Sequence, residues 1–396
     1  MTVGIAGDYV LRMKLGNNDL PLAFSAMHDF SIIQDFNRLL PYYQFQAADA
    51  SGLLTHIAPF DKNVTKLSCE IGTSDVSNIR NAFTFKTYRR FPEMINAAAT
   101  NFDSQGLLDI PNLFNPSRCR AMQGTIYDAL ASIAVNELLI DKLDISNQLQ
   151  VDRTLIQPNW SNAELFKYLK RTLGDNGGYS YYPYIYVKDS QYVFAMKSLE
   201  DMCSQDPVYK FIVNDEPYQD YLPVLDYAIF DNYNVLGIKG IKTQQFGYFD
   251  WHNSQWVESI DSYQDFLSLS DYISYDYEDQ ADSEPIYDTG RTNDFTRTFL
   301  GRERGEYYRR INSLVKMWIQ TPAGLPNLVP GEVVKVLFAD GLSSGDLATY
   351  QYSGYWLVER VCHSFGKTFF TKMLLTRAGI DTDQYTSAMR PLRRKL

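Results

Sequence analysis

The feature that most constrains the fold is a pair of apolar, strand-like segments near the C-terminus. Residues 353–379 read SGYWLVERVCHSFGKTFFTKMLLTRAG, in which two stretches rich in β-branched and aromatic residues flank Gly366. Such stretches favour extended strands, and a glycine between them favours a turn. The sequence therefore predicts two antiparallel strands joined at Gly366, and a fold built mainly from β-sheet.

Residues 1–112 carry the same kind of pattern. Polar, Gly, Pro and Asn residues separate their strand-like segments, which span Tyr9–Lys14, Ala23–Ile33, Tyr42–Ala47, Leu67–Ile71 and Ala82–Arg89. The aromatic content of the chain, 14%, favours strands and large contact surfaces over helical bundles. This portion is predicted to be all β.

Residues 113–215 change to a mixed pattern. One helix is predicted from an apolar period of three to four residues, formed by Met122, Ile126, Leu130, Ile133 and Ala134. A second helix begins where Ser161 and Glu164 have the spacing of a capping box, and it ends at Gly174. The segment YYPYIYVKDSQYVFAMKS predicts a hairpin that turns at residues 188–190.

Charge is concentrated in two neighbouring segments. Residues 243–290 contain eleven Asp or Glu and no Lys or Arg. The sign then reverses in GRERGEYYRRINSLVKMWIQ, residues 301–320. A basic helix is predicted here from an apolar face, formed by Tyr307, Ile311, Leu314, Val315 and Trp318.

Three polar positions look like parts of catalytic motifs but lack the required context. Cys362 and His363 are adjacent on one strand, so their side chains point to opposite faces and cannot act on each other. Ser343 lies in GLSSG, but a strand-like segment follows where a nucleophile elbow requires a helix. We predict a buried strand cysteine, a strand-end histidine bonded to the turn backbone and a serine in a hairpin loop.

The densest acidic stretch has no recognisable ligand pattern, and its carboxylates are Asp276, Glu278, Asp279, Asp282 and Glu284. It lacks the glycine and the final glutamate of a calcium loop. The four cysteines are scattered, without zinc or redox spacing, and are expected to be reduced. No phosphate or dinucleotide motif occurs. No metal or cofactor is expected.

The net charge of −10 argues against non-specific nucleic-acid binding, because such a protein must neutralise phosphates. DNA near this chain is expected to pass without adhering. No window reaches the roughly 18 apolar residues of a membrane span, so no membrane anchor is expected. Charged residues make up only 21% of the chain, which is low for a free monomer, and subunit interfaces would explain it because interface cores are depleted in charge.

The C-terminal block resembles the closing β-barrel of phage tail hub proteins, in particular the central baseplate hub of contractile-tailed bacteriophages. In that family a Pro-Gly strand entry precedes a strand of the form Y/W-x-V-x-x-V-x-H, a turn and a final apolar strand. The matching positions are Pro330, Gly331, Trp356, Val358, Val361 and His363. The segment TLIQPNWSNAELFKYLKRTLG also resembles the hub helix that follows a Trp-Ser/Thr entry.

The resemblance implies a fold that is mainly β with α+β insertions. Two antiparallel β-barrel domains of similar fold would carry two smaller inserted domains. The segments are 1–112 for the first barrel, 113–215 for an α+β domain, 216–242 with 312–380 for a discontinuous second barrel, 243–311 for an acidic insertion ending in a basic helix, and 381–396 for a basic tail.

The resemblance also implies a structural virion protein and no enzyme. A homotrimer would present six barrels, which adapt the sixfold tail tube to a threefold central spike and leave a channel for DNA. The implied partners are the tail tube protein, the central spike protein and other baseplate proteins. The expected location is the tail baseplate of the virion, with assembly in the host cytoplasm.

Two other functions stay open at this point. The chain could be a receptor- or carbohydrate-binding virion protein in which Tyr182, Tyr184 and Tyr186 stack on sugar rings. It could also be a cell-wall glycosidase that uses two carboxylates of the acidic segment as an acid pair.

The two charged segments supply the residues expected at the channel or at a subunit interface, which are Asp271, Asp276, Glu278, Asp279, Arg302 and Arg309. Opposite charges in adjacent segments can pair across an interface, and acidic residues in a channel repel DNA. Combined neutralisation of Asp276, Glu278 and Asp279 to their amides is therefore expected to impair assembly or DNA ejection. Plaque counts on virions that carry the variant measure this, and full infectivity would contradict it.

Overall fold

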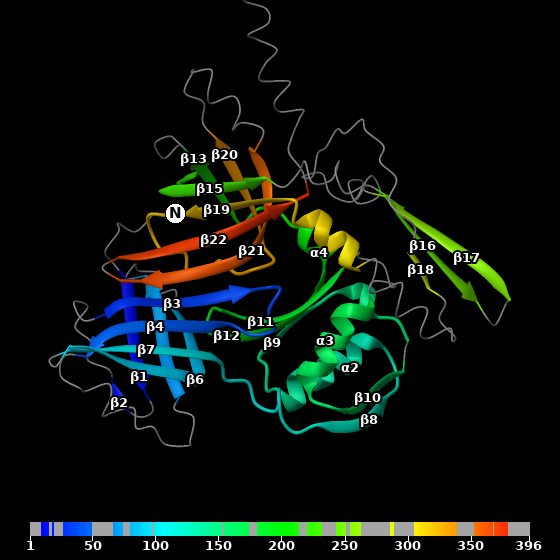
Figure 1. Ribbon diagram of the computed structural model, residues 1–396, viewed down its shortest axis with the longest axis horizontal. Helices are drawn as coiled ribbons and strands as arrows, with labels where there is room; N and C mark the ends of the chain where they lie inside the picture. Colours follow the sequence, from blue (N-terminus) through cyan, green and yellow to red (C-terminus); the bar gives the residue numbers. More distant parts are fainter. Residues whose placement is uncertain are drawn as a thin grey trace, which may run out of the picture.

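The computed structural model describes most of the chain, and the arrangement of its elements is drawn in Figure 1. The described residues are 9–15, 18–19, 27–49, 66–73, 80–96, 99–152, 154–173, 180–213, 220–231, 243–250, 254–262, 286–288, 305–338, 352–366 and 368–378. Strands predominate among them, and the largest assembly is a 14-stranded sheet. The predicted mainly β fold is confirmed.

Eight strands of this sheet form one continuous antiparallel path, which runs from top to bottom on the left of Figure 1. In spatial order they are β15 (Asp226–Asp231), β19 (Val315–Gln320), β22 (Phe369–Arg377), β21 (Gly354–Phe365), β3 (Met27–Asp35), β4 (Tyr42–Asp49), β7 (Ala99–Leu108) and β6 (Arg80–Asn96). The path therefore joins strands from both ends of the chain in a single sheet.

The path consists of two four-stranded halves with the same internal order. Counted along the chain, β3, β4, β6 and β7 are the first to fourth strands of one half, and they lie in the order β3-β4-β7-β6. The other half has β15, β19, β21 and β22 in the order β15-β19-β22-β21. In both halves the spatial order is therefore first, second, fourth and third strand. At the junction, the third strand of the C-terminal half, β21, pairs with the first strand of the N-terminal half, β3.

The third strand of each half also changes partner at a bulge. The first part of β6 pairs with β5 (Lys66–Thr73), and its register with β7 shifts between Thr87 and Arg89. The first part of β21 pairs with β20 (Val333–Phe338), and its register with β22 shifts between Val358 and Arg360. A bulge bends and twists a strand, so each long strand can serve two sheets.

Shorter strands extend the sheet from the parts of β6 and β21 that precede these bulges. In the N-terminal half, β5 pairs with β1 (Tyr9–Leu15), which pairs with β2 (Asn18–Asp19). In the C-terminal half, β20 pairs in parallel with β13 (Tyr209–Val213), which pairs with β14 (Leu222–Pro223).

A smaller α+β unit lies beside the N-terminal half, and its elements α2, α3, β8 and β10 are at the lower right of Figure 1. Its elements are β8 (Arg118–Met122), α2 (Ile126–Ser132), a π-helical turn (Ile133–Glu137), β9 (Lys142–Ile145), a 3₁₀ turn (Asn147–Leu149), β10 (Leu155–Trp160), α3 (Asn162–Thr172), β11 (Tyr181–Lys188), β12 (Gln191–Ser198) and α4 (Leu199–Cys203). A separate sheet contains β16 (Thr243–Asp250), β17 (Gln255–Ser262) and β18 (Ile286–Asp288).

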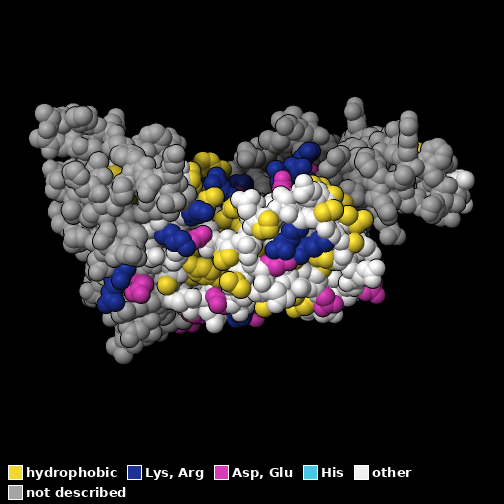
Figure 2. All heavy atoms as spheres, turned by 90° about the horizontal axis from the view of Figure 1, so that it is seen from below, with side chains coloured by type: hydrophobic (Ala, Val, Ile, Leu, Met, Phe, Trp, Pro, Cys, Tyr) yellow, Lys and Arg dark blue, Asp and Glu magenta, His cyan; other side chains and the backbone are white. Residues whose placement is uncertain are grey.

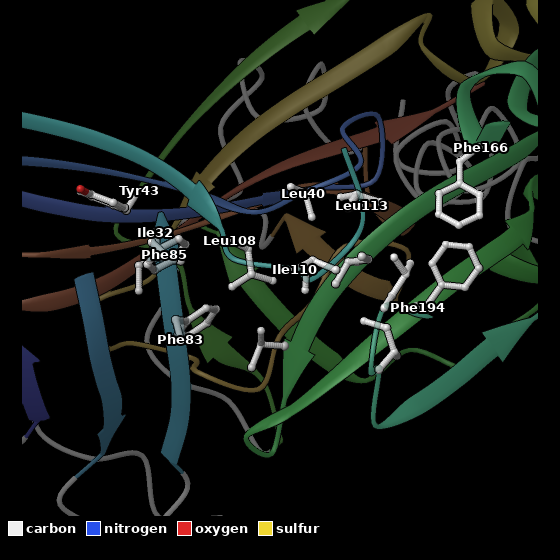
Figure 3. Packing of buried hydrophobic residues seen from close by; sticks show 14 of the residues in the cluster. Ile32, Leu40, Tyr43, Phe83, Phe85, Leu108, Ile110, Leu113, Phe166 and Phe194 are labelled. Carbon is white, nitrogen blue, oxygen red and sulfur yellow. The ribbon is translucent and has the colours of Figure 1, made fainter. Parts of the chain in front are cut away.

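The hairpin of β11 and β12 packs against both halves of the large sheet. One face of β11 carries Tyr181, Ile185 and Val187 into the core of the N-terminal half, and the alternate face carries its other tyrosines into the core of the C-terminal half. Figure 3 shows the first of these cores continuing from the sheet residues Tyr43 and Phe85 to Phe166 and Phe194 of the α+β unit. The hairpin thus holds the two halves in one body.

Polar contacts anchor the same hairpin at its turn. The two turn residues, Asp189 and Ser190, have φ of 52° and 60°, as the tight hairpin turn with two left-handed residues requires. The Ser190 amide donates to Asn81 Oδ1 at 3.0 Å, and Asn327 Nδ2 donates to Asp189 Oδ1 at 2.9 Å. The predicted turn at residues 188–190 is confirmed, and it touches both halves.

The junction between the halves combines backbone pairing with buried polar contacts. Six register pairs join β21 to β3, from Arg360 opposite Asp35 to Phe365 opposite Phe30. Arg360 donates to the buried Asp35 carboxylate from Nε at 2.9 Å, and a second nitrogen lies 2.9 Å from the same oxygen. A charge-assisted contact of this kind is stronger where water is excluded, so it favours this register over neighbouring ones.

Most predicted strands are found, and two predicted helices are wrong in part. Met122, predicted on the first helix, belongs to β8, and α2 begins only at Ile126. Phe365 pairs with Phe369 across Gly366, as expected. The helix predicted through Val315 and Trp318 ends at residue 312, and these two residues belong to β19. The apolar residues of this segment fit both a helical and a strand period, and pairing with β15 and β22 decides for the strand. Strand β7 was not predicted, because its sequence ATNFDSQGLL is largely polar.

The predicted pair of closed barrels is not confirmed by the described strands, whose pairings form an open, branched sheet. The domain boundaries stay predictions. The predicted capping box is confirmed, because the Glu164 amide donates to Ser161 Oγ and the Ser161 amide donates to Glu164 Oε2.

Replacement of Ser161 by alanine is expected to destabilise α3 by about 1 kcal/mol, because the helix loses its N-cap acceptor. Hydrogen-exchange mass spectrometry should detect about fivefold faster exchange in peptides covering α3. Ser132→Ala is the matched control, since Ser132 is exposed and caps no helix by its side chain. Equal exchange rates in both variants would contradict the capping role.

Candidate assembly interface

The eight-stranded path has two open edges among the strands that the structure describes. At one end, β15 pairs with β19 alone. At the other, residues 89–96 of β6 pair with β7 alone. An open sheet edge presents unpaired backbone groups that can pair with another chain. Pro92, which has no backbone N–H, is compatible with an edge strand.

The β15 edge also exposes apolar side chains. Phe230 is 50% exposed, and Leu225, immediately before the strand, is 64% exposed. Tyr227 packs edge-on against Phe338, so one face of the strand belongs to the core and the other faces out. An apolar open edge is a recognition surface for a further strand.

The outward face of the path has mixed charge in the described residues. Register places Ala228, Trp318, Leu374, Arg360 and Asp35 in one row across the strands. A second ion pair on these strands joins Lys316 and Glu359 at 2.8 Å. Figure 2 shows a different face, on which basic and acidic side chains are likewise interspersed. The row across the path therefore carries both signs of charge.

His363 is a buried strand residue with one hydrogen bond. Its Nδ1 lies 3.2 Å from Thr371 Oγ1, and Nε2 is buried without a partner. Burial lowers the pKa of the imidazole to about 3. The partner is a side chain of β22 and not the turn backbone, so the predicted strand placement is correct and the predicted partner is wrong. A neutral imidazole sealed in the core cannot reach a substrate.

Cys362 lies on the opposite face of β21 from His363, as strand alternation requires. Burial raises the pKa of its thiol to about 11, so the reactive thiolate is disfavoured at neutral pH. The residue is partly exposed, whereas full burial was predicted. Cys362 and His363 therefore do not form a catalytic pair of nucleophile and general base.

The three tyrosines considered for carbohydrate stacking are buried. Tyr182 and Tyr184 are 2% and 1% exposed, and Tyr186 is 8% exposed with its hydroxyl donating to Asp144 Oδ2 at 3.2 Å. Their rings contact Phe36 and one another. Burial raises the pKa of each phenol. These rings fill the core and are not accessible to a sugar in this structure.

Arg309 lies in a basic groove of about 480 Å³ between α3 and the helical residues 305–312. Its guanidinium bonds to Glu306 at 2.5 Å and to the Lys170 carbonyl at 2.7 Å, and it lies 5.8 Å from the Tyr182 ring. Burial, with the neighbouring Arg309 charge, lowers the pKa of Lys170 to about 8. Arg309 therefore connects two elements, and its predicted role at an interface stays a prediction.

The other predicted site residues lie outside the described residues, together with the predicted helix end and loop serine. They are Asp271, Asp276, Glu278, Asp279, Asp282, Glu284, Arg302, Gly174 and Ser343.

Within the described residues, no group of three or more His, Cys, Asp or Glu side chains is arranged to hold a metal ion. None of the described helices has both the length and the apolar character needed to cross a membrane.

Sequence reasoning missed the edge residues that define the candidate interface. Phe230 lies in DYAIFD and Arg89–Asn96 continue a strand whose first part is regular. Neither segment carries a motif, because an open edge depends on which strands pair over long distances. The only sequence signal is Pro92, which disfavours a central strand.

No family model matches the sequence, and no curated protein matches it significantly. Solved structures do match. The 43 kDa tail protein of prophage MuSo2 from Shewanella oneidensis is similar with a TM-score of 0.59 and 10% identity, over 93% of this chain and 98% of that one. The tail protein from Neisseria meningitidis MC58 is similar with a TM-score of 0.56 and 11% identity, over 96% and 99%.

The chain has the fold of phage tail proteins. Nearly the whole length of each chain is covered, so the likeness extends to both halves of the large sheet and to the α+β unit between them. The resemblance to phage tail proteins that the C-terminal strands indicated is confirmed at the level of the fold.

Because the His363 imidazole is fully buried, the free energy of unfolding should depend on pH. The unfolded chain takes up a proton near the ordinary pKa of 6.5, whereas the folded imidazole does so only at about 3. Stability should therefore fall as pH decreases from 6.5 towards 3, by up to about 1.4 kcal/mol per pH unit. Thermal unfolding of the native chain and of His363→Gln at pH 7, 6, 5 and 4 measures this.

The variant removes the titrating group and keeps all carboxylates, so it isolates the histidine contribution. The native chain is expected to lose more stability than the variant over this range. Parallel curves for the two proteins would contradict the sealed, neutral histidine.

Proposed function

We propose that this chain is a structural subunit of a phage tail, and that three copies form the central hub of the baseplate. The observation that carries the proposal is the repeated half-sheet. Two halves of identical strand order are joined in one chain. Each half would form one unit of the wall of a ring, called a wall unit below, so one subunit supplies two.

Three such subunits would present six wall units around one axis. Six units match a sixfold tail tube on one side, while the threefold repeat of the chain itself matches a threefold central spike on the other. The tail tube protein, the spike protein and other baseplate proteins are the proposed partners. Each half with its flanking strands would form one of the two barrel-like domains, within the boundaries predicted from sequence.

The proposed ring would leave a channel for DNA. The net charge of −10 and the pairing of Arg360 and Lys316 with carboxylates on the sheet support this part of the proposal, because they leave little net positive charge to attract phosphates. DNA would therefore pass without specific binding. The proposed location is the tail baseplate of the virion, after assembly in the host cytoplasm, and the proposed role is structural and not enzymatic.

Light scattering of the purified chain at neutral pH tests the proposal. We expect a mass of three times 45.5 kDa, because a ring of six wall units closes only when three subunits supply two units each. A chain that stays monomeric across the micromolar range, alone and with its spike protein, would contradict the trimeric hub.

A further inference from the structure

The groove beside α3 holds more cationic than anionic side chains. Its basic members come from α3 and from the helical residues 305–312, and they are Lys167, Lys170, Arg171 and Arg309. Among the described lining residues the one carboxylate is Glu306, which is bonded to Arg309 at 2.5 Å. The described part of the groove is therefore basic, and its acid is already paired.

Lys170 lies half-buried in this groove with two neutral partners. Its Nζ donates to the Asn37 carbonyl at 3.2 Å and lies 5.1 Å from the centre of the Tyr182 ring. The Arg309 guanidinium lies 5.8 Å from the centre of the same ring. Two cations thus share one aromatic ring, and the Lys170 ammonium has no carboxylate of its own among the described residues.

The described carboxylates that act on the charge of Lys170 are each paired with another cation. The pairs are Glu306 with Arg309 at 2.5 Å, Asp35 with Arg360 at 2.9 Å and Glu359 with Lys316 at 2.8 Å. Burial, together with the Arg309 charge, lowers the pKa of Lys170 to about 8. Lys170 is thus the unpaired cation of this cluster, and a further carboxylate would stabilise its charged form.

The remaining described walls of the groove are largely apolar. Leu39 lies between β3 and β4, Ala163 and Phe166 belong to α3, and Pro183 belongs to β11. The volume of about 480 Å³ is in the range of sites that enclose a small ligand or a few side chains. A ligand that suits these walls joins an anionic group to an apolar body.

The position of the groove on α3 favours a carboxylate over a phosphate. Lys170 and Arg171 lie in the last turn of the helix, and Arg309 donates to the Lys170 carbonyl at 2.7 Å. The carbonyl end of a helix carries partial negative charge, which opposes a dianion more than a monoanion. Phosphate sites are typical of the opposite, N-terminal end. The bond between Arg309 and Glu306 shows that a carboxylate suits these cations.

We propose that this groove binds an acidic side chain of a partner protein, an Asp or Glu with apolar neighbours. The carboxylate pairs with Lys170, and the neighbouring side chains pack against the apolar walls. The assignment to a protein partner rests on the proposed function, because a structural subunit meets its neighbours through their side chains. The preference for a carboxylate rests on the groove alone.

Fluorescence anisotropy with the full chain tests the preference. The probe is a rhodamine-labelled peptide of sequence Leu-Glu-Leu-Glu-Leu with an amidated C-terminus, and the comparison peptide has glutamine in place of both glutamates. We expect the glutamate peptide to bind about tenfold more tightly, because it makes a charge-assisted contact in place of a neutral one. Equal affinities, or binding of neither peptide, overturn the inference.

Replacement of one lysine assigns the effect to the groove. Lys170→Gln removes the charge and keeps a donor for the Asn37 carbonyl, so it should weaken binding of the glutamate peptide about tenfold and leave the glutamine peptide unchanged. Lys142→Gln is the matched control, since Lys142 is exposed on β9 and does not line the groove. An equal loss in both variants, or none in Lys170→Gln, overturns the inference.

The pH profile gives a readout that a purely structural role of Lys170 would not produce. Lys170, with its pKa of about 8, loses its charge between pH 7 and pH 9, whereas guanidinium and carboxylate groups ordinarily keep theirs. Burial raises the pKa of Tyr182, which stays neutral. Affinity for the glutamate peptide should therefore fall over this range in the native chain and stay constant in Lys170→Gln. Parallel profiles overturn the inference.

Competition and light scattering separate the remaining outcomes. Inorganic phosphate that displaces the glutamate peptide at lower concentration than acetate does indicates a phosphate site and overturns the inference. A trimer with equal affinity for the two peptides also overturns it and leaves the hub standing. A monomer that selects the glutamate peptide contradicts the hub and leaves the carboxylate preference standing.

Discussion

The structure depends on the pairing of β21 with β3, which makes one sheet from strands more than 300 residues apart in sequence. Backbone hydrogen bonds alone would allow neighbouring registers. The buried Asp35 carboxylate, held by Arg360, and the contacts of Ser31 and Ser364 with Asp29 select this one. A slip by one residue would turn the buried faces outward and separate these polar partners, so the register is strongly specified.

Everything else is arranged around that junction. The β11–β12 hairpin fills the space behind both halves, with its apolar and aromatic residues divided between the two cores. The long strands β6 and β21 bend at equivalent bulges, so each half turns away from the shared path in the same manner. The result is one chain that contains two half-sheets of the same strand order, joined edge to edge.

The local features of the fold were predictable from sequence, whereas its long-range pairings were not. The Ser161–Glu164 cap, the turn at Asp189 and Ser190 and the turn at Gly366 each depend on a few adjacent residues. The repeat of strand order has no counterpart in sequence similarity. The strand at Val315–Gln320 was read as helix, because its apolar residues suit either period until β15 and β22 pair with it. His363 was placed correctly on a strand, but only the packed structure identifies Thr371 as its partner.

The central claim is that the two halves of the large sheet are equivalent units, so that three copies of the chain can supply six such units to one ring. Cryo-electron microscopy of the assembly, at a resolution that separates strands, tests this most directly. The account predicts six equivalent half-sheets around one axis, with two from each of three copies. An assembly in which the two halves of one copy occupy different positions relative to the axis, or one without three copies, would contradict it.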